Sequence, residues 1–231
     1  MGGPDTLAEL VAELWRHEPG LLAFVFDLLF VRCVGSVGKT YTHVLAMPER
    51  GTSVVAERVW AFRANDRLIW LRVHPSVTRI GEYAFWDCNG LASLTFPDGL
   101  TEIGGYAFDG CTRLTSLVLP DGLTEIGRNA FQDCDGLASV TFPDGLTEIG
   151  ISAFSGCTGL TSLVLPDGLA QVGEYAFCGC AGLTAVAIPD GVAVIGKDAF
   201  WGCTRLTAVT VPQACAVGRG AFPEHVRVLR N

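Results

Sequence analysis

The sequence predicts an α/β solenoid, in which short repeats stack on one another to form a parallel β-sheet connected by short helical turns. Two observations carry this prediction. The dipeptide Ala-Phe recurs every 23 residues from Ala84-Phe85 to Ala199-Phe200, with a Cys three residues after each Phe and a Pro nine residues after each Cys. The chain is also 49% hydrophobic. Because a 23-residue unit is too small to bury its own apolar side chains, each unit must bury them against its neighbours.

The first half of each unit predicts a short strand. Leu91-Ala92-Ser93-Leu94-Thr95-Phe96 alternates apolar and polar residues toward its end, and Pro97 closes it by removing a backbone donor. Asp98-Gly99 then supplies the residues of a tight turn. The outward positions of these strands hold small residues, so this face is expected to offer little side-chain specificity.

The second half of each unit returns the chain beneath the strand. Leu100 and Ile103 are expected to point inward, and Gly104 to permit a tight bend. Ala107, Phe108 and Cys111 have helical spacing, which predicts one or two helical turns between residues 106 and 111. Stacking then aligns the Phe and Cys side chains of successive units into buried ladders.

The repeat pattern places the solenoid at residues 56–231, with a worn first unit at 57–79, six clear units at about 80–217 and a truncated C-terminal cap at 218–231. Residues 1–55 differ in pattern and are predicted to be a partly helical, apolar N-terminal cap, with an amphipathic helix from Thr6 to Arg16. The apolar run from Leu21 to Val34 contains Asp27 and Arg32. It is too short and too charged to span a membrane, and it does not resemble a secretory signal.

A second period of 46 residues lies over the first. Leu114 to Leu119 is repeated without change from Leu160 to Leu165, whereas the intervening unit carries Leu137 to Phe142. The array is therefore inferred to have grown by duplication of a two-unit block, and no middle unit is expected to hold a unique catalytic centre.

The unit Leu-x-x-Leu-x-Phe-Pro-Asp-Gly-Leu-Thr-x-Ile-Gly-x-x-Ala-Phe-x-x-Cys, read from Leu91 to Cys111, resembles the BspA-type leucine-rich repeat. The resemblance covers about two thirds of the chain. It implies a right-handed leucine-rich-repeat solenoid of the kind found in bacterial surface adhesins and in protist proteins. It also implies protein binding and not catalysis.

The charge of the chain limits the class of partner. Residues 1–83 carry nine basic and nine acidic side chains, whereas residues 84–231 carry seven basic and fifteen acidic ones, so the whole net charge of −8 lies in the repeats. An acidic array repels nucleic acid and anionic membranes. Ladders of Asp and Glu, such as Asp98 to Asp190, are interpreted as turn formers and a soluble face, because parallel rungs do not converge the six to eight oxygens that calcium requires.

Nine cysteines and one glycine-rich turn invite other chemistry. Six cysteines share one in-phase position and are expected to be buried, reduced thiols. Reduced thiols favour an intracellular protein, with a cell-surface or secreted protein as the alternative. Cys178 and Cys180 lack the further ligands of a zinc site. Gly35 to Thr40 resembles a P-loop, but Cys33 stands where the first Gly belongs, so nucleotide binding is only a remote alternative.

The function that these observations favour is a non-catalytic protein-interaction scaffold without cofactor or metal, and a surface adhesin of the same fold is the alternative. Large and variable side chains gather around the Ala-Phe pairs, and aromatic and Arg residues are frequent anchors in interfaces. We therefore predict partner contacts at Tyr83, Trp86, Tyr106, Trp201 and Arg205. The identity of the partner and the oligomeric state are left open.

Overall fold

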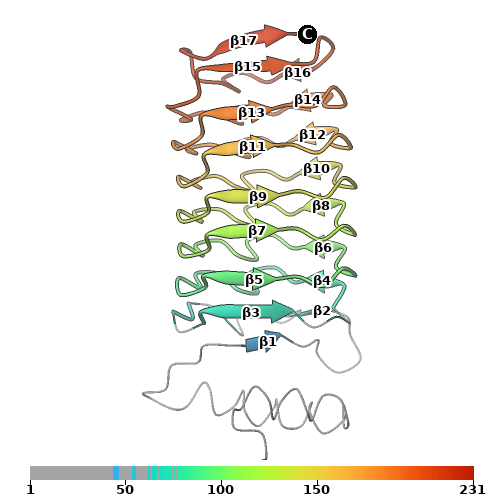
Figure 1. Ribbon diagram of the computed structural model, residues 1–231, viewed down its shortest axis with the longest axis vertical. Helices are drawn as coiled ribbons and strands as arrows, with labels where there is room; N and C mark the ends of the chain where they lie inside the picture. The colour runs from blue at the N-terminus through green and yellow to red at the C-terminus, as the bar shows by residue number, and fades with distance from the viewer. Residues whose placement is uncertain are drawn as a thin grey trace, which may run out of the picture. The chain divides into compact units, whose positions relative to one another are not determined.

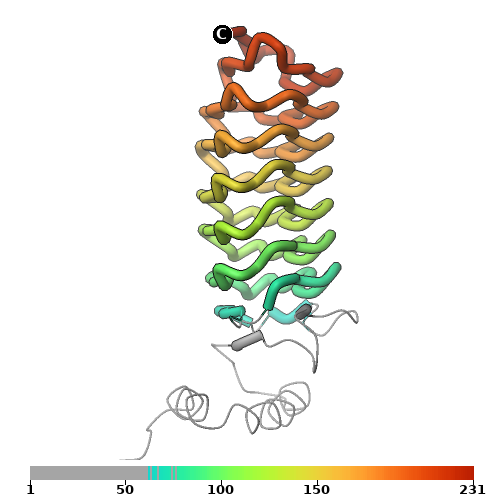
Figure 2. Tube along the Cα trace, turned by 90° about the vertical axis from the view of Figure 1, so that its right-hand side faces the viewer, coloured from blue at the N-terminus to red at the C-terminus, as the bar shows by residue number. Residues whose placement is uncertain are grey.

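Each 23-residue unit forms one rung of a solenoid, and successive rungs stack in register (Figures 1 and 2). The computed structural model describes residues 44–46, 54–55, 62, 64–66, 68–73, 75 and 77–231. The chain divides into two units, Met1–Thr40 and Tyr41–Asn231, and every described residue lies in the second. The predicted cap helix, the apolar run and the Gly35–Thr40 turn lie outside the described residues.

The longer strands form one face of the rungs, named here the strand face. In the strands between residues 93 and 211, the outward side chains are exposed and the inward ones are buried or half-buried, as the alternation of residues 91–96 predicts. These strands are β1 (Val44–Ala46), β3 (Trp70–Val73), β5 (Ser93–Thr95), β7 (Ser116–Val118), β9 (Ser139–Thr141), β11 (Ser162–Val164), β13 (Ala185–Ala187), β15 (Ala208–Val211) and β17 (Arg227–Arg230).

A second parallel sheet of two-residue strands forms another face of the rungs. Its eight strands follow one another in the order β2, β4, β6, β8, β10, β12, β14, β16. They are β2 (Val54–Val55), β4 (Arg79–Ile80), β6 (Glu102–Ile103), β8 (Glu125–Ile126), β10 (Glu148–Ile149), β12 (Gln171–Val172), β14 (Val194–Ile195) and β16 (Ala216–Val217).

The two-unit period of the sequence is visible in the backbone of the strand face. From β5 onward the strands pair two by two, as β7 with β9, β11 with β13 and β15 with β17, while β5 pairs back with β3. The pairs repeat every 46 residues. Every pairing is parallel and in register, so that Ser116 lies opposite Ser139.

The segments that carry the Ala-Phe pairs form turns, and the predicted helical turns are absent from the described repeats. We name these stacked segments, Gly81–Cys88 and its equivalents through Gly196–Cys203, the turn column. Alternate amides bond differently: Ala84, Trp86 and Cys88 donate to the carbonyl three residues earlier. Tyr83 and Phe85 donate across to Gly105 and Ala107 of the next rung, at 3.0 and 2.8 Å.

This alternation is the physical reason that no helix forms. An α-helix uses its amides within the same segment, whereas here every second amide must face the next rung. The third residue of every turn takes a positive φ of 52–57°, although none of these residues is glycine. They are Tyr83, Tyr106, Asn129, Ser152, Tyr175 and Asp198. Such a conformation is strained for non-glycine residues and is held by its surroundings.

The core consists of ladders that run from rung to rung. Six phenylalanines from Phe85 to Phe200 are fully buried, and neighbouring rings stack at 5.1–5.5 Å between centroids. Full burial of each ring contributes roughly 1.5–3 kcal/mol. Gly104 is needed for the approach of the rungs, because a Cβ there would lie 2.8 Å from the backbone nitrogen of Glu82.

Parallel pairing also reaches residues before position 56, where the sequence pattern places the start of the solenoid. Strand β1 pairs with β3, with Val44 opposite Leu71, and β2 pairs with β4, with Val54 opposite Arg79. Both strands therefore belong to the sheets of the solenoid. The weak sequence signal has a simple cause, because residues 44–55 lack the Ala-Phe and Cys markers of the later units.

The Phe ladder is expected to dominate the stability of the stack. Replacing Phe154 with Ala should lower the free energy of unfolding by about 3–5 kcal/mol, because the rungs above and below cannot collapse into the space left by the ring. Guanidinium unfolding followed by circular dichroism measures this loss. Val164→Ala is the control, since Val164 is 70% exposed and should change stability by less than about 0.5 kcal/mol. Similar losses in the two variants would contradict the role of the ladder.

Candidate functional site

Three of the five predicted contact residues come together on the turn column. Tyr83 and Tyr106 occupy the same position in successive rungs, and their rings stack at 4.8 Å with 9° between planes. The Trp86 ring meets Tyr83 edge to face at 5.9 Å. All three side chains are half-buried. We name Tyr83, Trp86 and Tyr106 the N-terminal aromatic group.

Of the other two predicted residues, Trp201 lies elsewhere on the same column and Arg205 lies just after its last segment. Trp201 follows Trp86 by 115 residues, or five rungs, and at about 4.8 Å a rung the two are roughly 24 Å apart. Trp201 is 60% exposed, and Arg205 is exposed as well. The five residues therefore form two separate groups, and a single small ligand could not touch both.

A carboxyl group adjoins the N-terminal aromatic group. Asp109 occupies the position of Trp86 in the next rung, is only 8% exposed, and accepts a hydrogen bond from the Trp86 side chain. Burial first and the nearby carboxylate of Asp133 second raise the pKa of Asp109 to about 6, against the lowering effect of the hydrogen bond from Trp86. This carboxyl therefore titrates close to neutral pH.

A Tyr–Lys pair on the turn column was missed by the sequence prediction. Lys197 Nζ lies 5.5 Å from the centroid of the Tyr175 ring and 3.7 Å from Asp198 Oδ2. Tyr175 donates its amide to the carbonyl of Lys197 at 2.9 Å, which aligns the two residues. The sequence feature that could have revealed this pair is its spacing of 22 residues, one less than the repeat. In the turns, amides that cross to the next rung donate to the carbonyl of the residue 22 positions ahead.

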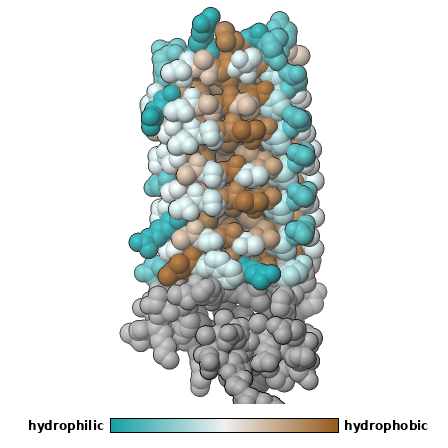
Figure 3. All heavy atoms as spheres, in the orientation of Figure 1, coloured by the Kyte–Doolittle hydropathy of each residue, from teal (hydrophilic) through white to brown (hydrophobic). Residues whose placement is uncertain are grey.

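The strand face is more apolar than its small residues predict. Val118 and Val164, one two-unit period apart, are 66% and 70% exposed. Figure 3 shows an apolar band along this face with polar residues on both sides. The sequence prediction placed these valines at outward positions and counted them as small residues, so it did not anticipate an apolar band.

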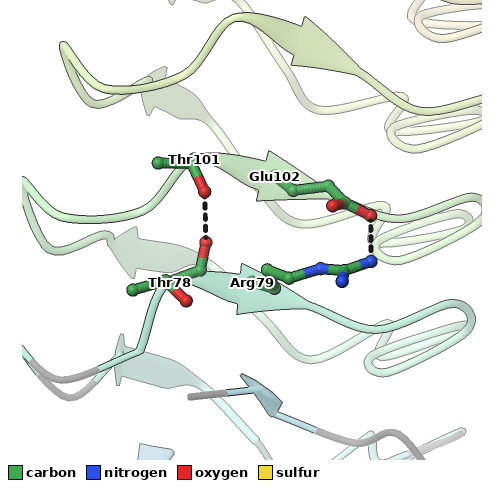
Figure 4. Close-up of polar contacts among 4 residues, drawn as sticks. All are labelled: Thr78, Arg79, Thr101 and Glu102. Atoms are coloured by element: carbon green, nitrogen blue, oxygen red, sulfur yellow. Dashed lines mark hydrogen bonds and ion pairs between the residues drawn. The ribbon is translucent and has the colours of Figure 1, made fainter.

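Acidic side chains line the sheet of short strands. Glu102, Glu125 and Glu148 are in direct register on β6, β8 and β10. Arg79 binds the first of them, with Nη2 2.7 Å from Glu102 Oε1, and the Thr101 hydroxyl donates to the carbonyl of Thr78 at 3.0 Å (Figure 4). Across the described residues, no group of three or more His, Cys, Asp or Glu side chains is arranged to hold a metal ion.

The in-phase cysteines are buried thiols, as their repeat position predicts. Each from Cys88 to Cys203 donates through Sγ to the carbonyl of a Phe 26 residues earlier, at 2.9–3.5 Å. Burial raises the pKa of Cys88 and of Cys203 to about 12. These thiols therefore stay protonated at neutral pH and are poor nucleophiles. Cys178, on the turn column, is only half-buried.

Comparison with known proteins identifies what the rungs resemble. The model of the BspA type leucine rich repeat region matches residues 59–157 and 124–227, in six copies. A leucine-rich repeat protein of T. pallidum, TpLRR, is 34% identical, with a TM-score of 0.59 over 70% of this chain and 73% of that one. No curated protein matches the chain. Among the described residues, none belongs to a helix long and apolar enough to cross a membrane.

Two further solved structures share the fold. A leucine-rich repeat protein from Bacteroides ovatus ATCC 8483 is 25% identical, with a TM-score of 0.57 over 74% of this chain and 53% of that one. One from Eubacterium ventriosum ATCC 27560 is 24% identical, with a TM-score of 0.65 over 75% of this chain and 46% of that one. The chain thus spans about half the length of these two proteins.

Thiol modification tests the burial of the Cys ladder. In a Cys33→Ser variant, the native protein is expected to react rapidly with Ellman's reagent at one thiol, that of Cys178, and at all eight after unfolding. Adding Cys178→Ser should abolish the rapid phase. Rapid reaction of more than one thiol in the native protein would contradict the buried, protonated ladder.

The raised pKa of Asp109 predicts that this carboxylate lowers the free energy of unfolding at neutral pH and not at acid pH. Its folded pKa of about 6 lies above the ordinary value of 3.8, so the folded state binds the proton more tightly and gains stability as pH falls from about 6 to 4. At pH 7.5, Asp109→Asn should therefore unfold at higher guanidinium concentration than the unmodified protein, and the advantage should shrink at pH 4.5. The exposed Asp121→Asn is the control. A lower midpoint for Asp109→Asn at pH 7.5 would contradict the prediction.

Proposed function

Because the chain belongs to the BspA-type leucine-rich repeat family, we propose that it is a non-catalytic scaffold that binds a protein partner through its turn column. The proposal rests on the described rungs. Their buried residues are the same from rung to rung, whereas their surface residues differ.

The observation that supports the turn column as the binding surface is that its surface residues vary between rungs while its buried residues stay the same. From Phe85 to Phe200 every rung buries the same Ala, Phe and Cys. The residue that follows each Phe in the same turns changes from Trp86 through Asp109 to Trp201. Stacked and half-exposed aromatic side chains present large contact areas at a low cost in side-chain entropy. A partner can therefore recognise individual rungs here, whereas the strand face largely repeats itself.

The state of the thiols also supports a non-catalytic role. Nucleophilic cysteines need a lowered pKa and access to solvent, whereas burial raises the pKa of Cys111, Cys157 and Cys180 well above the ordinary value. The same thiols are a consequence of packing, because each is a small buried side chain that donates to a Phe carbonyl of an earlier rung.

A cell-surface adhesin is the second candidate. It would use the same fold and the same turn column, and it is supported by the resemblance of the repeat to those of bacterial surface adhesins. An intracellular scaffold is supported by the thiol-rich sequence. Protease digestion of intact cells separates the two, because only a surface protein would be degraded while the cell membrane is closed.

Partner capture tests the proposed contact surface. The purified chain and its Trp86→Ala and Trp201→Ala variants are immobilised, and bound proteins are quantified by mass spectrometry. At least one variant should retain less than about a tenth of the partner, since interface anchors contribute 2 kcal/mol or more. Thr141→Ala, on the strand face, is the control and should retain the partner. Equal amounts of partner bound to all four proteins would contradict the proposal that the turn column is the contact surface.

A further inference from the structure

Two turns of the column begin with the same five residues. Gly-Glu-Tyr-Ala-Phe stands at residues 81–85 and again at 173–177. The Tyr takes a positive φ in both turns, 56° at Tyr83 and 57° at Tyr175. In both, its amide donates to the carbonyl 22 residues ahead, at 3.0 and 2.9 Å. The two copies therefore hold the same Glu and Tyr on the same backbone conformation.

The later copy holds an ammonium group that comes from the next rung. Lys197 places Nζ 5.5 Å from the centroid of the Tyr175 ring. A hydrogen bond with the Tyr175 side chain, followed by the charges of Tyr175, Asp198 and Glu174, raises the pKa of Lys197. This turn sequence therefore binds a lysine ammonium within the chain itself.

In the earlier copy, the residue that corresponds to Lys197 is Gly105, which has no side chain. A Cβ at Gly105 would lie 3.9 Å from Glu82 Oε1, so a side chain that left the backbone here would begin beside a carboxylate. Other rungs carry long side chains at the same position, such as Arg128 and Glu174. Glycine at residue 105 means that the chain supplies no ammonium of its own from this position.

The surroundings of Tyr83 are more aromatic than those of Tyr175. Tyr106 stacks on Tyr83 at 4.8 Å and takes the position that Asp198 has beside Tyr175. Trp86 takes the position of a Cys in the later copy. Ammonium groups are attracted to the faces of Trp and Tyr rings, and the methylene groups of lysine pack on apolar surfaces. The earlier copy therefore suits a whole lysine side chain.

The charge around the earlier copy favours a cation as well. Residues 80–112 carry five acidic side chains and no basic one. Arg79, just before this run, binds one of the five, Glu102 (Figure 4). Glu82 is exposed, and Asp109 accepts the hydrogen bond of Trp86. A basic partner is drawn to such a surface, whereas an acidic one is repelled.

We propose that Glu82 and the N-terminal aromatic group bind a lysine side chain of the partner protein. Its ammonium lies beside Glu82 and Tyr83, in the way that Lys197 lies beside its own Glu-Tyr pair, and its methylene groups pack on Trp86. The inference rests on the proposed scaffold function and names the chemistry that the partner presents to the turn column.

An arginine in the corresponding position behaves differently from Lys197. Arg128 follows Tyr106 by 22 residues, the spacing of Tyr175 and Lys197. Its Nε donates to Asn129 Oδ1 at 3.2 Å, and the residue before Tyr106 is a Gly and not a Glu. The example within the chain is therefore specific for lysine on a Glu-Tyr pair.

Amide chemical shifts test the proposal. The isotope-labelled full chain is titrated with the acetylated and amidated peptide Ser-Thr-Lys-Thr-Ser, and with the same peptide carrying Glu or acetyl-lysine in place of Lys. The Lys peptide should shift the amides of Tyr83, Trp86 and Gly105 to saturation, because the ammonium lies among them. The other two peptides lack the positive charge and should bind at least about fivefold more weakly.

Matched variants locate the site. Glu82→Gln should weaken the Lys peptide about threefold, as expected for the loss of an exposed ion pair. Glu174→Gln, the same change in the copy that already holds Lys197, should leave binding unchanged. Gly105→Lys supplies an internal ammonium and should weaken the peptide at least about fivefold, because a tethered group competes at a high effective concentration. Gly105→Ala adds only the Cβ and should bind the peptide normally.

The reverse change should create a second site. Lys197→Gly removes the internal ammonium, so the Lys peptide should then shift the amide of Tyr175 as well. Circular dichroism checks that each variant is folded, and the Glu82 and Glu174 variants decide the test if a Gly105 variant does not fold. Equal binding of the Lys and Glu peptides, equal weakening by Glu82→Gln and Glu174→Gln, unchanged binding in Gly105→Lys, or an unshifted Tyr175 in Lys197→Gly would each overturn the proposal.

The two proposals fail separately. Partner capture that is lost in Trp86→Ala but kept in Gly105→Lys, with no binding of the Lys peptide, would retain the turn column as the contact surface and remove the lysine site. Peptide binding that Gly105→Lys abolishes, with equal partner capture by both Trp variants, would retain the lysine site and remove the proposed contact of the turn column with the captured partner.

Discussion

The structure depends on one constraint, which is that every rung must complete its backbone hydrogen bonds through the next rung. The two-residue strands and the turn column both meet it, and in the turns every second amide crosses to the neighbouring rung. A buried amide left unpaired would cost more than the bond itself contributes. The positive φ of Tyr83 and its equivalents, the close approach at Gly104 and the absence of helix from the described repeats all follow from this requirement.

Periodic features of the fold could be predicted from the sequence, and the local shape of the turns could not. The burial of Phe108 and Cys111 follows from a repeat that places the same residue at the same point in every rung. Ala107, Phe108 and Cys111 also have helical spacing, but a turn with alternating amides produces the same pattern of buried side chains. Spacing reports which side chains face inward, and only the hydrogen bonds between rungs distinguish a turn from a helix.

The candidate site was predictable to the extent that it keeps the 23-residue period. Tyr83 and Tyr106 are one period apart, so their contact follows from stacking, as does the distance of Trp201 from Trp86. The pairing of Tyr175 with Lys197 departs from that period by one residue, and the pairing of β15 with β17 departs from it by four, since Ala208 lies opposite Arg227. Charge was informative as well, but a single sum over residues 84–231 hides the run from 80 to 112 that carries five acidic side chains and no basic one.

The two-by-two pairing on the strand face has a mechanical consequence. Within a pair such as β7 and β9, a pull along the stack must break strand hydrogen bonds together with those of the turns and the short strands. Between pairs, as at β5 and β7, the strand face adds no pairing. A stretched column would therefore open first at alternate junctions, so that the two-rung block, and not the single repeat, is the unit in which this protein resists tension.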